Sequence, residues 1–80
     1  MSREERIKKI AKLKAERVFI EAEIKRWTEI AWRNVELFKK EAHAEARQNC
    51  FNELVKWQEE LENNYHKVWD LEEEFYRKEN

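Results

Sequence analysis

The chain has 80 residues, a formal net charge of −1 and neither glycine nor proline. This length accommodates one domain, and the missing glycine and proline argue against a sheet protein, because these residues make most tight β-turns. Charged residues make up 44% of the sequence, with many Ala, Glu, Lys and Leu, which predicts an all-α fold. The balanced charge provides no basic surface for nucleic acid.

Membrane and redox signals are also absent from the sequence. No apolar run approaches the ~20 residues that span a bilayer, and no signal-peptide core follows Met1. We therefore expect a protein without membrane contact, located in the cytoplasm or obtained as a soluble recombinant product. Cys50 is the only cysteine, so an intrachain disulfide cannot form, and we interpret it as a small, partly buried thiol.

The first predicted helix begins near Arg3. Ser2 and Glu5 have the spacing of a capping box, in which the serine side chain accepts a hydrogen bond from the backbone of the third helical residue. Apolar residues then recur at steps of three and four, as in helices packed in bundles or coiled coils. This stripe consists of Ile10, Leu13, Ile20, Ile24, Trp27, Ala31 and Phe38, with Arg17 and Asn34 as polar interruptions.

The second predicted helix covers about residues 52–78 and carries a cleaner stripe: Leu54, Trp57, Leu61, Asn64, Val68, Leu71 and Phe75. The two stripes are out of phase. One explanation is an unbroken helix that crosses the middle by steps of four from Phe38 to Leu54. The other is a first helix that ends near residue 47, a turn at about residues 47–52, and a cap supplied by Asn49 or Asn52. We expect the turn, within a single helical domain that covers residues 1–80.

The charge distribution predicts the direction of pairing. Residues 1–17 contain seven basic and three acidic side chains, whereas residues 53–80 contain four basic and nine acidic ones. Parallel pairing would place like charges side by side, and antiparallel pairing places the basic head against the acidic tail. This holds for a hairpin and equally for an antiparallel dimer of long helices.

The apolar stripes are wider than a two-stranded coiled coil requires. The additional residues are Ile7, Val18, Ile30, Trp32, Val35, Leu37, Phe51, Val55, Tyr65, Trp69 and Tyr76. We therefore predict an antiparallel helical hairpin that self-associates, as a dimer, into a four-helix bundle. The alternatives are a monomeric three-helix bundle with an additional break near Thr28, and a single long helix in an antiparallel coiled coil.

The predicted core and interface residues follow from these stripes. They are Ile10, Leu13, Ile20, Ile24, Trp27, Phe38, Leu54, Trp57, Leu61, Val68, Trp69, Leu71 and Phe75. Asn34 and Asn64 are predicted to fix the register of the helices, because a buried asparagine in a helical seam costs stability but specifies pairing.

The sequence contains no strong candidate for a catalytic or metal-binding site. No Glu-x-x-His motif of a di-iron bundle occurs, and Glu62, His66 and Asp70 share a helical face that points away from the seam. His43 lies two helical turns from Cys50, too far to activate it as a nucleophile in an unbroken helix. We predict neither catalytic activity nor any metal, cofactor or small-molecule ligand.

In style, the sequence resembles de novo designed helical assemblies, or a chimera of natural helices. The shared features are the capping box, the absence of loop residues and many Glu-to-basic pairs four residues apart, such as Glu4 with Lys8. Cys50, Arg17 and the lack of glycine after the helices depart from that style. We expect a scaffold protein whose activity is folding and self-association through an aromatic-rich face. The alternative is a natural coiled-coil module that docks helices of another protein.

Overall fold

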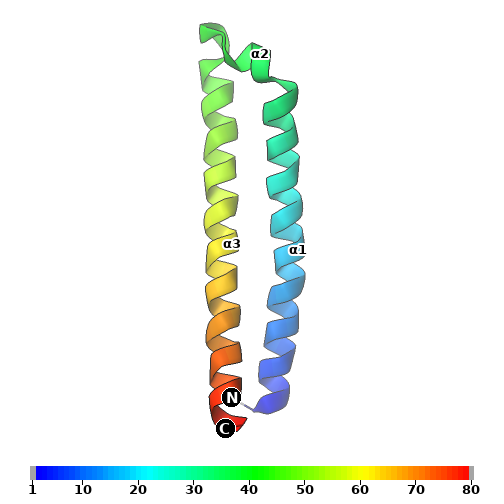
Figure 1. The fold of residues 1–80 in the computed structure, drawn as a ribbon. Coiled ribbons are helices and arrows are strands. Elements are labelled where there is room, and N and C mark those ends of the chain that lie inside the picture. The colour runs from blue at the N-terminus through cyan, green and yellow to red at the C-terminus, as the bar shows by residue number, and fades with distance from the viewer. Residues whose placement is uncertain (1, 80) are drawn as a thin grey trace.

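The fold is an antiparallel pair of long helices, and the all-α prediction is confirmed. The computed structural model describes the backbone of residues 2–79 and the side chains of residues 2–74. Helix α1 (Arg3–Arg33) is followed by the short helix α2 (Val35–Phe38), the 3₁₀ helix η1 (Glu41–His43) and helix α3 (Ala44–Glu79). Figure 1 shows α1 and α3 side by side, with α2 near one end and both termini at the other.

Helix α1 begins where the capping box predicts. The backbone N–H of Glu5 donates to Ser2 Oγ at 3.2 Å, and Glu4 and Glu5 place negative charge in the first turn. The helix then continues without a break through Thr28, whose hydroxyl donates to the Ile24 carbonyl at 2.7 Å. The predicted break near Thr28 is therefore wrong, because this hydroxyl is satisfied inside the helix and does not cap a new one. The alternative of a monomeric three-helix bundle, which required this break, is therefore wrong as well.

The chain reverses at residues 34–43, so the turn predicted at about residues 47–52 is wrong. Helix α1 ends at Asn34, whose backbone N–H and side-chain Nδ2 both donate to the Ile30 carbonyl, at 3.1 and 2.8 Å. The backbone is extended at Lys40 (φ −85°, ψ 138°), just before η1. No described residue has a positive φ, which explains how the chain turns without glycine. The reversal also excludes the single long helix.

Residues 47–52 are helical, and four of their side chains bond within the hairpin or along α3. Cys50 is buried, and its thiol donates to the Trp27 carbonyl at 3.7 Å. Gln48 donates to Asn52 at 2.9 Å along the exposed side of the helix. The phase difference between the two stripes has a simple origin, since the stripes lie on separate helices and need no common phase.

Arg47 links α3 by a hydrogen bond to the connection between the long helices, residues 34–43. Its Nη1 donates to the Phe38 carbonyl at 2.7 Å, which satisfies an end group of α2. Replacing Arg47 with alanine should lower the free energy of unfolding by about 1 kcal/mol, the typical net value of one such bond. Urea titrations followed by circular dichroism would measure this. Gln48→Ala is the control, because it removes a contact within α3 only; an equal loss in both variants would contradict a fastening role for Arg47.

The hairpin measures 58 × 16 × 15 Å and consists of one pair of long helices. Along residues 2–79, no helix combines the length and the apolar character that crossing a bilayer requires. A molecule this thin covers only one side of each helix, and the remaining sides are open to other contacts.

Candidate interaction surface

The inner sides of α1 and α3 form a continuous seam, and every member is buried or half-buried. The seam consists of Arg6, Ile10, Leu13, Arg17, Ile20, Ile24, Trp27 and Ala31 from α1, and of Cys50, Leu54, Trp57, Leu61, Asn64, Val68 and Leu71 from α3. All follow steps of three and four, as two packed helices require. Phe38, beyond α1, is half-buried, and the side chain of Phe75 lies outside the described residues.

Arg6 is a seam residue that the sequence prediction missed. Its side chain is buried, and its Nη2 lies 3.7 Å from Glu74 Oε2 of α3. Ile7, the neighbouring apolar residue, is 51% exposed instead. The signal was present in the spacing, since Arg6 lies seven residues before Leu13, but its charge argued against an inward position.

A polar layer interrupts the seam near its middle. Arg17 Nε donates to Asn64 Oδ1 at 2.8 Å, and Asn64 Nδ2 donates to the Leu13 carbonyl at 2.8 Å. The Arg17 guanidinium also lies 3.9 Å from the centre of the Tyr65 ring, a cation–π distance. Asn64 is buried and joins the two long helices at one level, so it holds α3 against α1 there. Asn34, the other predicted register residue, ends α1 by bonding to its own helix.

Two further contacts and the polar layer define the register of the hairpin. Arg6 lies beside Glu74 near the termini, Leu13 bonds to Asn64 further along, and Trp27 meets Cys50 toward the connection. These contacts show which part of α3 lies beside each part of α1.

Eight large apolar side chains are exposed among the described residues of the two long helices, and the seven other than Phe19 form what we call the apolar face. Each of the seven directly follows a seam residue in the sequence. The apolar face consists of Ile7, Val18 and Trp32 from α1, and of Phe51, Val55, Tyr65 and Trp69 from α3, with exposed fractions from 36% to 71%. One step along a helix turns the side chain by about 100°. Because α1 and α3 run in opposite directions, that turn carries both sets to the same side of the hairpin.

Trp69, which the sequence placed beside the second stripe and among the core and interface residues, belongs to this face and not to the seam. It is 59% exposed, whereas Val68, the residue before it, is 2% exposed. Adjacent residues on a helix cannot both point into one narrow seam. Within this chain, the ring of Trp69 packs only at the surface, 6.3 Å from Tyr65 and 5.7 Å from His66 between centroids. These rings line a shallow apolar hollow that also includes Leu61 and Gln58.

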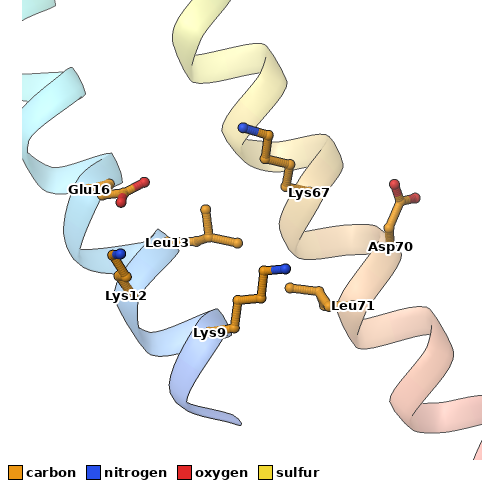
Figure 2. A pocket seen from close by; sticks show the side chains of 7 residues that line it. All are labelled: Lys9, Lys12, Leu13, Glu16, Lys67, Asp70 and Leu71. Atoms are coloured by element: carbon orange, nitrogen blue, oxygen red, sulfur yellow. The ribbon is translucent and has the colours of Figure 1, made fainter. Parts of the chain in front are cut away.

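The opposite side of the hairpin is charged. Figure 2 shows a hollow there between α1 and α3, in which charged side chains surround Leu13 and Leu71. The charged members are Lys9, Lys12, Glu16, Lys67 and Asp70. The mixture of three ammonium groups and two carboxylates favours neither an anion nor a cation, so we interpret this side as the one that faces solvent. The Lys14–Glu72 ion pair (3.2 Å) bridges the helices on the apolar side instead.

The groupings considered for catalysis or metal binding are dispersed. His66 Nε2 lies 3.8 Å from Glu62 on the exposed surface of α3, and the Cys50 thiol faces the Trp27 carbonyl inside the seam. Within the described part of the chain, no three His, Cys, Asp or Glu side chains gather closely enough to hold a metal ion.

The apolar face is thus the part of the hairpin surface on which exposed apolar side chains gather. Comparison with known proteins found no matching family model, no similar curated protein and no similar solved structure.

Proposed function

We propose that the protein is a structural helical module whose activity is self-association through the apolar face, with two hairpins forming a four-helix bundle. The observation that carries this proposal is the concentration of seven exposed apolar side chains on one side of a hairpin whose other side is charged. Exposed apolar patches of this extent on small proteins usually mark interfaces. The resemblance in style to designed helical assemblies agrees with such a scaffold role.

The size of the face fits a second copy. A surface of 58 × 16 Å has a projected area of about 900 Å², close to the ~800 Å² that each partner contributes to a standard interface. The apolar residues also extend over its whole length. Ile7, Tyr65 and Trp69 lie toward the termini, Val18 near the middle, and Trp32, Phe51 and Val55 toward the connection. A second hairpin matches this elongated shape, and a two-fold axis would use the same residues on both copies.

Two phenylalanines provide a matched test of this proposal. Phe51 and Phe19 are both 59% exposed, but they lie on different sides of the hairpin. Phe51 belongs to the apolar face, whereas Phe19 lies on the charged side, in an edge-to-face contact with Trp57 at 5.7 Å between ring centroids. We expect Phe51→Glu to weaken the dimer at least about 100-fold, because the symmetric interface would bury two unpaired carboxylates. Phe19→Glu should leave the dimer intact. Sedimentation equilibrium over a wide concentration range, with helicity followed in parallel, measures both effects.

The outcomes separate the two functional classes. Equal weakening by both substitutions would contradict the assignment of the interface to this face. A wild-type chain that remains a helical monomer at every concentration would refute self-association. That result would favour the alternative function, in which the same face docks helices of another protein.

A further inference from the structure

The two copies of a dimer could stack face to face in two ways, and the hairpin carries information that distinguishes them. If the two-fold axis runs along the long dimension, both connections lie at one end, and α1 of each copy packs beside α3 of the other. If the axis runs across the long dimension, the connections lie at opposite ends, and like helices pack together. Both arrangements bury the same apolar face. They differ in the charged groups and in the side-chain sizes that they bring together across the interface.

The charge distribution favours the arrangement in which the two-fold axis runs along the hairpin. Within the described residues, the basic head (from residue 2) and the acidic tail (up to residue 79) lie side by side toward the terminal end of the hairpin, as the Arg6–Glu74 and Lys14–Glu72 pairs show. With the axis along the hairpin, each basic head also lies beside the partner's acidic tail. With the axis across it, α3 packs against α3, and its acidic tail meets residues 44–61, which carry four acidic and two basic side chains. Like charges across an interface disfavour that arrangement.

Side-chain size points in the same direction. Rotation about the long axis keeps every residue at its own level, so the register within one hairpin also gives the register between two. Trp69 lies between the Asn64 and Glu74 levels, and Ala11 lies between the matching Leu13 and Arg6 levels. The large ring of Trp69 would therefore meet the small side chain of Ala11 in the other copy.

We propose that the second copy binds with its connection at the same end, so that α1 of each chain packs against α3 of the other. This inference rests on the proposed self-association and adds the orientation of the partner. It also places Lys14 of one copy near Glu62 of the partner subunit, since Glu62 lies on the same side of α3 and within about one helical turn of that level.

Distances between spin labels test the orientation. Cys50 is first replaced with alanine, and a single labelling site is introduced in the connection by Ala42→Cys, which changes an exposed residue of η1. Packed helices lie about 10 Å apart, so we expect label-to-label distances of about 10–30 Å once the label arms are included. The opposite arrangement would separate the labels by nearly the 58 Å length of the hairpin. Double electron–electron resonance measures this difference, and dilution with unlabelled chain identifies the distance as intermolecular.

A second labelling site, Glu4→Cys, shows whether the result depends on a local disturbance of the connection. Glu4 is exposed near the other end of the hairpin, and the proposed arrangement predicts a short distance there as well. Long distances at both sites in a sedimenting dimer would overturn the orientation while leaving self-association intact. Absence of an intermolecular distance, together with a monomer in sedimentation, would overturn the proposed function and the orientation with it.

Discussion

Replacing Ile20 with alanine should lower the free energy of unfolding by about 2–4 kcal/mol, the range for deleting a buried isoleucine side chain. Ile20 is 7% exposed and lies in the middle of the seam, where α3 covers it. A hairpin of two helices has few other apolar contacts to compensate for this loss, since only one side of each helix is covered. Urea denaturation followed by circular dichroism, at several protein concentrations, gives the change in free energy.

Ile7 is the matched control for Ile20, because the same side chain is 51% exposed there and lies on the apolar face. Alanine at Ile7 should cost less than about 1 kcal/mol in dilute protein, as expected of an exposed site. Its cost should grow with protein concentration, because dimer formation would bury Ile7 and couple association to stability. Equal costs at both positions in dilute protein would contradict the seam described above.

The seam is the part of the fold that spacing alone predicts well. Steps of three and four are imposed by the geometry of packed helices, so the periodic residues of both halves are the ones that α1 and α3 turn toward each other. The exceptions have physical reasons. Arg6 was overlooked because a buried guanidinium is unusual, although its chain here reaches Glu74. Trp69 was counted among the core and interface residues from its place beside the stripe, but Val68 occupies the inward direction and leaves Trp69 exposed.

The site of the reversal could not be predicted from the residues that usually mark turns. The sequence has no glycine or proline, and the asparagines drew attention to residues 47–52. Asn34 fits the heptad spacing, so it was interpreted as a register residue, whereas the structure uses it to end α1. The connection that follows contains Lys, Glu, Leu and Ala, which are good helix formers, beside Val35, Phe38 and His43. Only the pairing of α1 with α3 shows that the chain must reverse there.

The apolar face was visible in the sequence as an excess of apolar residues beside each stripe, but its position was not. Whether such residues gather on one side of a hairpin depends on the direction in which the helices run and on where the chain turns. An incorrect turn would change the register, and with it the levels at which Trp32, Phe51 and Trp69 lie. The structure places them on one side, and this makes a specific interface testable.

Breaking the polar layer of Arg17 and Asn64 should also lower the free energy of unfolding substantially. Asn64→Ala removes the acceptor of Arg17 Nε, whose Nη2 already has no hydrogen-bond partner among the described residues. A buried polar group left unpaired costs about 1–3 kcal/mol, and more when it is charged, so we expect a loss of about 2–3 kcal/mol. Asn64→Asp keeps an acceptor for Arg17 while removing the donor to the Leu13 carbonyl, so it should recover part of the loss.

Removing both partners should have the opposite outcome. A chain with Arg17→Met and Asn64→Leu replaces the polar layer with apolar side chains, and such replacements are often neutral or stabilising. Its stability should equal or exceed that of the wild type, because no buried polar group is left unpaired. The cost would be specificity: without Asn64 the two helices can slide or open into alternative assemblies, which sedimentation would detect as mixed species. Strictly additive effects of the two single substitutions in a double-mutant cycle would contradict this role, because groups that act as a pair must show coupling.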